Sequence, residues 1–277
     1  MSFFNKFTKS KYDFNRDGTL QTVIDFYKSV RPLDYKVDDP SQYKFYEIEN
    51  GERPDIISQK LYGTPNFYWT FFIVNDFLHD GYSSWPMSQE SFYSYIQTEY
   101  EGFVITTNPS ITRNTDQQIT DFKDSLAGKF TIGETITGSI SGATGTLVQK
   151  NIDLNQLVIQ NVSGSFLGDP NAITNSTENI TGATSTDTVA SYIVYKYADA
   201  PHHYYTIGDE AERYIIPSTF FSDSANAYTG TVATNSLTFK TNRAYLFDLN
   251  EQRSKIRVID PNFIDEFAKD FETLINE

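Results

Sequence analysis

Aromatic residues are distributed very unevenly along this chain, and their distribution limits how it can fold. The 277 residues include 22 Phe and 19 Tyr, yet Phe166 is the one aromatic residue between Thr131 and Ala190. In that stretch charged residues are sparse, and Ser, Thr, Gly and Asn dominate. A composition that changes abruptly at two points predicts a separate module inserted into a host domain.

The central stretch has the pattern of short strands. Residues 154–162 are rich in branched side chains between turn formers, and residues 130–138 alternate, as strands do. A weak repeat relates residues 134–138 (Glu-Thr-Ile-Thr-Gly) to residues 178–182 (Glu-Asn-Ile-Thr-Gly), each followed within a few residues by Ala-Thr. We predict a small all-β module with tight glycine turns. A flexible Ser/Thr/Gly linker is the alternative.

The chain is strongly acidic, with 36 Asp and Glu against 22 Lys and Arg and a net charge of −14. Nucleic acids and anionic membranes repel such a chain, so basic protein partners are favoured. The absence of cysteine excludes disulfides, thiolate metal sites and cysteine nucleophiles, and suits a reducing cytoplasm. We expect no signal peptide, because the N-terminus lacks an apolar region, and no membrane span of about 20 apolar residues.

A strand and two helices are predicted after residue 44. Residues 45–49 alternate like a strand. Pro54 suits the first turn of a helix, where its missing N–H is not needed, and Gly63 can end that helix. Thr64 and Pro65 would begin a second helix. That helix should be buried on more than one side, because apolar residues surround it: Phe67, Trp69, Phe71, Phe72 and Val74.

This module carries a family resemblance. Residues 46–58 (Tyr-Glu-Ile-Glu-Asn-Gly-Glu-Arg-Pro-Asp-Ile-Ile-Ser), then 61–63 (Leu-Tyr-Gly), 68–69 (Tyr-Trp) and Asn75, resemble a LysM module. The match continues through residues 85–88 (Trp-Pro-Met-Ser) and on to Tyr100. That continuation is similar to one family in particular, the LysM-like baseplate wedge subunit of T-even-like contractile-tailed bacteriophages.

The C-terminal region also resembles that family. Residues 246–251 (Leu-Phe-Asp-Leu-Asn-Glu) and 253–261 (Arg-Ser-Lys-Ile-Arg-Val-Ile-Asp-Pro) are similar to its closing hairpin, and residues 201–204 (Pro-His-His-Tyr) fall where the family tends to have His-His-Tyr. Without the family, Asp260 and Pro261 indicate a helix start. Phe263, Phe267, Phe271 and Leu274 follow at helical spacing. This stripe should bury in the chain's own core or against a partner subunit.

Together these patterns predict an α+β fold in four parts. They are an N-terminal arm (1–43), a LysM-like strand–helix–helix module (44–100), an inserted β-rich module (101–196), and a C-terminal hairpin with an amphipathic helix (197–277). The resemblance covers about residues 1–100 and 197–277, and the insert is the departure. Within the arm, residues 20–27 should form a short strand or helix and residues 33–42 a polar loop.

Candidate chemistry is scarce. Residues 13–19 imitate the start of an EF-hand loop, but Ile24 stands where the bidentate Glu belongs, so we expect a polar turn without calcium. His202 and His203 would point to opposite faces of a strand, and His79 stands alone, so we interpret all three as structural. No nucleophile elbow, phosphate loop or zinc motif occurs. We predict no catalytic residue, no metal and no cofactor.

The resemblance implies a structural protein of the virion, located in the tail baseplate and assembled in the host cytoplasm. It implies docking onto other wedge proteins and joining of neighbouring wedges into a sixfold assembly, without nucleic acid, membrane or small-molecule substrate. Large side chains dominate interface energies, and the predicted contact residues are Tyr62, Tyr68, Trp69, Tyr82, Trp85, Pro86, Phe267 and Phe271. For Trp69, core packing is favoured over contact, and Trp85-Pro86 is the better surface candidate. The alternative is a LysM-type tail protein that binds peptidoglycan or another glycan, which the lack of an export signal disfavours.

Overall fold

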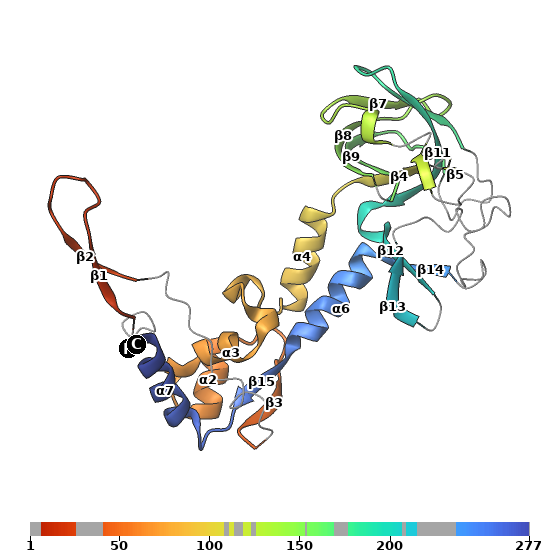
Figure 1. Cartoon of the computed structure of the whole chain (residues 1–277). Coiled ribbons are helices and arrows are strands. Elements are labelled where there is room, and N and C mark those ends of the chain that lie inside the picture. Colours follow the sequence, from red (N-terminus) through yellow and green to blue (C-terminus); the bar gives the residue numbers. More distant parts are fainter. Residues whose placement is uncertain are drawn as a thin grey trace. The chain divides into compact units, whose positions relative to one another are not determined.

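A computed structural model describes residues 7–25, 41–107, 111–113, 119–122, 126–152, 154–168, 177–206, 209–214 and 237–276. The fold mixes helices and strands, as the sequence predicts (Figure 1). It divides into two compact units, residues 1–92 with 248–277 and residues 93–247. Apart from residues 41 and 42, the loop expected at 33–42 lies outside the described residues.

The first unit is built on a two-stranded antiparallel sheet with helices between its strands in the sequence. Strand β3 (Tyr43–Glu47) pairs with β15 (Lys255–Ile259), and Tyr46 lies opposite Ile256. Helix α2 (Pro54–Tyr62) has Pro54 in its first turn and ends at Gly63, whose φ is 70°. The strand–helix–helix order therefore follows the prediction.

The second predicted helix is interrupted. It begins as a 3₁₀ turn, η2 (Pro65–Phe67), which the Thr64 side chain caps, and continues as α3 (Trp69–Val74). Two further 3₁₀ turns follow, η3 (Asp76–Leu78) and η4 (Gly81–Ser83). Then α4 (Gln89–Glu99) leads into the second unit.

The C-terminal helix α7 (Ile264–Asn276) completes the core of the first unit. Phe267 and Phe271 are buried, and their ring centroids lie 6.4 and 4.7 Å from that of Trp69. The helix begins three residues after the predicted first residue, Pro261, because residues 261–263 form a turn in which the Asp260 carboxylate accepts the Asn262 N–H at 2.9 Å. Of the two alternatives for the apolar stripe, the chain's own core is the one observed.

The predicted C-terminal hairpin is wrong. Residues 242–254 form one helix, α6 (Asn242–Ser254), and β15 follows it directly and pairs with the distant β3. The Thr241 hydroxyl accepts the Ala244 N–H at 3.1 Å and so caps this helix. The cap and the helix-forming residues after it favour a helix where the family resemblance suggested a strand.

The N-terminal arm contains a hairpin. Strands β1 (Lys9–Tyr12) and β2 (Gln21–Ile24) pair antiparallel, so the segment that was expected to be strand or helix is a strand. In the loop between them, the Asp13 carboxylate accepts the N–H groups of Asp17 (3.2 Å) and Gly18 (2.7 Å). The EF-hand-like residues thus form a polar turn whose carboxylate is occupied by the backbone.

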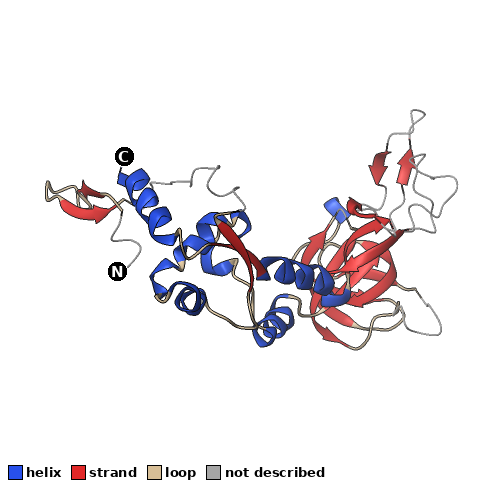
Figure 2. Cartoon of the chain, turned by 90° about the horizontal axis from the view of Figure 1, so that it is seen from below, coloured by secondary structure: helices blue, strands red, loops and turns tan. Residues whose placement is uncertain are grey.

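The second unit contains a closed six-stranded barrel, drawn in red with the other strands in Figure 2. Its strands, in spatial order, are β10 (Asn179–Gly182), β11 (Thr188–Lys196), β4 (Phe103–Thr107), β9 (Gln156–Ser163), β8 (Thr144–Asn151) and β7 (Thr135–Gly138). Buried aliphatic side chains such as Ile105, Leu147 and Leu157 fill it. The aromatic-poor stretch is therefore a packed β module and not a flexible linker.

Smaller elements complete the second unit. A three-stranded sheet has β12 (Pro201–Thr206) between β13 (Asp209–Tyr214) and β14 (Leu237–Thr241). Strands β5 (Ile111–Arg113) and β6 (Ile119–Phe122) form a hairpin, and the 3₁₀ turns are η5 (Leu126–Gly128) and η6 (Tyr197–Asp199).

The sequence repeat corresponds to a reciprocal arrangement in the barrel. Strands β7 and β10 pair antiparallel, so the two copies lie side by side. The Glu134 carboxylate, at the start of the first copy, accepts the N–H groups of Thr184 and Ser185 (both 2.9 Å) in the turn after the second copy. The Glu178 carboxylate, at the start of the second copy, accepts the N–H groups of Ile140 (3.0 Å) and Ser141 (2.9 Å) in the turn after the first copy. Each copy thus stabilises the turn of the other.

Candidate protein-docking surface

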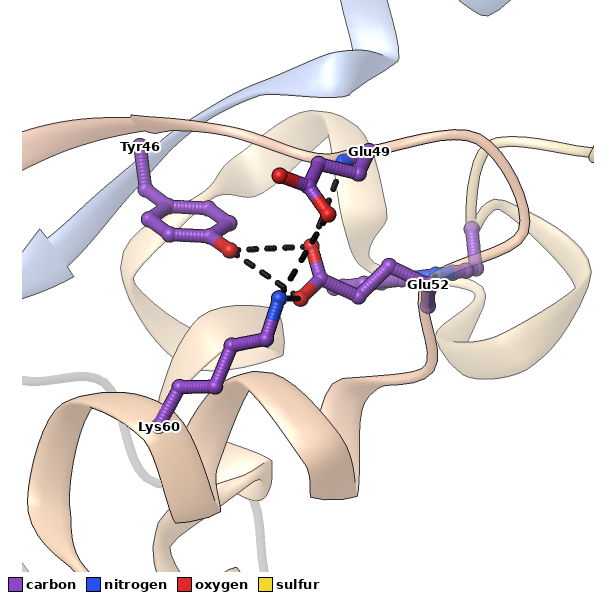
Figure 3. A network of polar contacts seen from close by, with 5 residues as sticks. Tyr46, Glu49, Glu52 and Lys60 are labelled. Carbon is purple, nitrogen blue, oxygen red and sulfur yellow. Dashed lines mark hydrogen bonds and ion pairs between the residues drawn. The ribbon is translucent and has the colours of Figure 1, made fainter.

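Glu52 is the centre of a polar network that fixes the turn between β3 and α2 (Figure 3). The Tyr46 hydroxyl donates to its two carboxylate oxygens at 3.1 and 2.9 Å, and the Glu49 N–H donates at 3.2 Å. Lys60, on α2, forms an ion pair with the same carboxylate. A buried carboxylate needs such partners, so the network joins the strand, the turn and the helix.

The charge state of this network is that of a structural ion pair. Burial alone would raise the pKa of Glu52, but hydrogen bonds from Lys60 and Tyr46 outweigh burial and hold the pKa below its ordinary value of 4.5. Burial, followed by the hydrogen bond to Glu52, raises the pKa of the Tyr46 hydroxyl. A general acid or base works best with a pKa near the operating pH, and both groups are shifted away from it.

Trp85, predicted to lie at the surface, is 9% exposed. Its indole N–H donates to the Glu52 carbonyl at 2.9 Å, and its ring contacts Phe72 with centroids 5.5 Å apart. Its neighbour Pro86 is partly exposed. The indole therefore closes the same turn from the other side.

Among the other predicted contact residues, Trp69, Phe267 and Phe271 lie together in the core. Tyr62 is partly buried, and its hydroxyl donates to the Ile259 carbonyl at 2.9 Å, with a pKa raised by burial. In this fold these four aromatic side chains hold α2, α3, α7 and β15 together.

Tyr82 is the predicted contact residue with the most accessible ring. It is 62% exposed, and its ring lies 6.4 Å from that of Tyr68 and 5.5 Å from that of Phe72. Phe77, on the neighbouring turn η3, is also exposed. The three residues whose rings are in contact, Tyr68, Phe72 and Tyr82, are called the aromatic row below.

Phe45 was not among the predicted contact residues, although it is 74% exposed, more than Tyr82. It lies on β3, and its side chain alternates with that of Tyr46, which packs against the core. The alternation of residues 45–49 could have identified it, because a strand with one face in the core turns every second side chain outward.

The histidine prediction is partly wrong. The Nδ1 atoms of His202 and His203 are 2.8 Å apart, although neighbouring strand residues should point to opposite faces. The pairing of β12 with β14 shifts register between Pro201 and His203, and such a bulge brings successive side chains to one side. The His202 ring stacks on Tyr245 with centroids 3.8 Å apart, which is a packing role.

Within the described ranges, no three His, Asp or Glu side chains come together as a metal site would require. None of the helices in the described part of the chain combines the length and apolar character that a membrane crossing requires.

Comparison with known proteins identifies the first part of the chain. Residues 1–128 match the family model described as base plate wedge protein 53. The chain is also similar to baseplate wedge protein gp53 of Enterobacteria phage T4, with 23% identity over 100 residues, which are 36% of this chain and 50% of that protein. The aligned part of the chain thus spans half the length of this relative. On this evidence the first part of the chain is similar to the baseplate wedge proteins of T4-like phages, which supports a place in the virion tail baseplate.

Proposed function

We propose that this protein is a structural scaffold of the baseplate wedge. Its first unit docks onto other wedge subunits and joins neighbouring wedges, in a sixfold assembly, while the tail is built. Its contribution is contact area formed on assembly, without catalysis, cofactor, nucleic acid or membrane. The family match over residues 1–128 carries this proposal.

The first unit supports a docking role through its rigidity. We infer that β3, α2 and α3 form a LysM-like module, which β15 and α7 complete from the far end of the chain. Its buried aromatic side chains fix the backbone, and the ion pair of Glu52 with Lys60 fixes the first turn. A rigid unit loses little conformational freedom on binding, and the aromatic row provides the large side chains on which interfaces depend.

Co-purification with the other wedge proteins of the same phage tests the proposal. The full-length chain should bind at least one of them, and Tyr82→Ala should weaken that binding about tenfold, as loss of a central aromatic contact does. Tyr95→Ala is the matched control, because Tyr95 is an exposed tyrosine of the second unit. Equal loss in both variants would show that the aromatic row is not the contact.

A glycan-binding assay distinguishes the scaffold function from that of a cell-wall-binding protein. Peptidoglycan and chitooligosaccharide are offered to the same full-length chain under the same conditions. Retention on glycan, with no wedge protein retained, would contradict the scaffold role.

A further inference from the structure

The β3–β15 sheet of the first unit has two different outer edges. The Ile48 N–H donates to the Ser254 carbonyl and the Asp260 N–H donates to the Gln42 carbonyl, both at 2.8 Å. Because hydrogen-bonded pairs alternate along an antiparallel ladder, the even-numbered residues of β3 bond to β15. The N–H and C=O groups of Tyr43, Phe45 and Glu47 therefore point away from β15.

The outer edge of β15 is covered by side chains. The Asn75 carboxamide accepts the Arg257 N–H at 2.8 Å and donates to the Arg257 carbonyl at 2.9 Å, as a neighbouring strand would. The Tyr62 hydroxyl donates to the Ile259 carbonyl two residues further on. No further strand can pair with this edge without displacing both side chains.

The outer edge of β3 is open. In the part of the chain that the structure describes, no hydrogen bond reaches the outward backbone groups of Tyr43, Phe45 or Glu47. Phe45, in the middle, is highly exposed, and Glu47 forms no ion pair with a described residue. Natural proteins usually protect such an edge, and an edge left open can bind an added strand.

The β1–β2 hairpin is the complementary element. Both strands are largely exposed, and the hairpin is a separate sheet from β3 and β15. A two-stranded hairpin alone is marginally stable in water. The Asp25 N–H donates to the Thr8 carbonyl at 2.9 Å, so the same alternation turns the backbone groups of Lys9 and Lys11 outward.

We propose that β1 of one copy of this chain adds, antiparallel, to the outer edge of β3 of a second copy. The outward residues of the two strands meet when Lys9 lies opposite Glu47 and Lys11 lies opposite Phe45. Charge complementarity favours this register, because it places Lys9 directly opposite Glu47. Glu49, beyond the end of β3, is already paired with Lys60. The inference rests on the proposed function and deepens it by naming a contact between neighbouring wedges.

This contact has a consequence for assembly. Each copy offers one hairpin and one open edge, which are different surfaces, so the contact is head-to-tail. Head-to-tail contacts close into a ring when the rotation permits and otherwise form a filament. Repetition of a single contact is thus sufficient to link copies around a circle.

Disulfide trapping tests the register, since the chain has no cysteine of its own. Residues in a hydrogen-bonded antiparallel pair have Cα atoms about 5.5 Å apart, within the range of a disulfide. A mixture of Lys9→Cys and Glu47→Cys chains should give a covalent dimer under mild oxidation. The matched mixture of Ser10→Cys with Glu47→Cys should give about tenfold less, because residue 10 points to the other face.

Three results would overturn the proposal: no dimer, equal yields from the two mixtures, or an internal bridge in monomers that carry both Lys9→Cys and Glu47→Cys. With both substitutions in one chain, a ladder of covalent oligomers is expected. Co-purification with wedge proteins is a separate measurement, so failure of the trapping leaves the proposed function standing, and the reverse also holds.

A backbone test addresses the open edge without cysteine. Phe45→Pro removes an N–H that does not bond to β15, and proline is tolerated at such a position on an edge strand. Phe45→Val is the control, because it removes the ring and keeps the donor. Self-association measured by sedimentation should fall about tenfold further in Phe45→Pro than in Phe45→Val. Equal association of these two variants would contradict strand addition.

Discussion

Replacement of Glu178 by Gln tests the reciprocal arrangement in the barrel. The Glu178 carboxylate accepts N–H groups from Ile140 (3.0 Å), Ser141 (2.9 Å) and Leu167 (2.8 Å), and also the Ser141 hydroxyl at 2.8 Å. All four partners are donors. A carboxamide of the same size has one acceptor oxygen, and its NH₂ group must face at least one of these donors.

The magnitude follows from the donors that lose their acceptor. With the amide oxygen on the Ile140 and Ser141 side, the Leu167 N–H faces the NH₂ group, and a buried donor without a partner costs about 1–3 kcal/mol. The remaining bonds also lose the contribution of the charge. We expect Glu178→Gln to lower the free energy of opening the barrel by about 2–4 kcal/mol. Glu134→Gln should have a similar effect, because Glu134 has the equivalent set of partners.

Hydrogen exchange is the suitable assay, because the two tryptophans, Trp69 and Trp85, both lie in the first unit and do not report on the barrel. Peptides from residues 131–190 should exchange faster in Glu178→Gln, while peptides from the first unit remain unchanged. Glu101→Gln is the control, because Glu101 is exposed in the same unit. If Glu178→Gln lowered the free energy of opening the barrel by less than about 0.5 kcal/mol, the usual size for an exposed substitution, the reasoning would be refuted.

The same carboxylates predict a pH dependence. Burial would raise the pKa of both groups, but hydrogen bonds, from Ser185 and Thr131 to Glu134 and from Ser141 and Leu167 to Glu178, lower each pKa below the ordinary value of 4.5. A carboxyl whose folded pKa is lowered adds stability above its unfolded pKa and loses it as the pH falls through the folded pKa. Barrel protection should therefore fall as the pH drops below about 4.5, and less steeply in either Gln variant.

Three further substitutions test packing. Asn75→Leu leaves the edge of β15 without its side-chain partner. It should lower the free energy of unfolding, measured by urea titration of tryptophan fluorescence, by about 2–4 kcal/mol. Phe271→Ala should cost about 3–5 kcal/mol in the same assay, whereas Phe263→Ala, at a side chain 37% exposed, should cost much less. Gly138→Ala should destabilise the barrel by about 1–3 kcal/mol, because its Cβ would lie 2.6 Å from the Glu178 carboxylate. Gly128→Ala is the control, because a Cβ there would have nothing within 4 Å and should have little effect. Hydrogen exchange measures both variants.

Features that depend on neighbouring residues were predictable from the sequence. Pro54 and Gly63 marked the ends of α2, and the phenylalanine stripe marked α7. The branched residues of 154–162 marked a barrel strand, β9. These signals act within a few residues, through caps, fixed φ angles and side-chain periodicity, so the rest of the fold was not needed to read them.

Features that depend on distant partners were not predictable in the same way. The pairing of β15 with β3 joins the two ends of the chain, and no local pattern specifies it. The burial of Trp85 depends on the Glu52 carbonyl, 33 residues away. Aromatic side chains are common both in cores and at interfaces, so composition alone could not decide between core and contact for Trp85.

The two points at which the chain enters and leaves the barrel are close together, so the barrel can be inserted without disturbing the fold of the first unit. The chain enters the barrel at Phe103 and leaves it at Lys196, and these two residues lie directly opposite each other in the pairing of β4 with β11. Their Cα atoms are therefore about 5 Å apart, a gap that a short turn can bridge. Replacement of residues 103–196 by a Gly-Ser turn should leave the urea midpoint of tryptophan fluorescence unchanged, because a module whose ends are adjacent adds little constraint to its host. A lower midpoint would show that the barrel stabilises the first unit and is not an independent insertion.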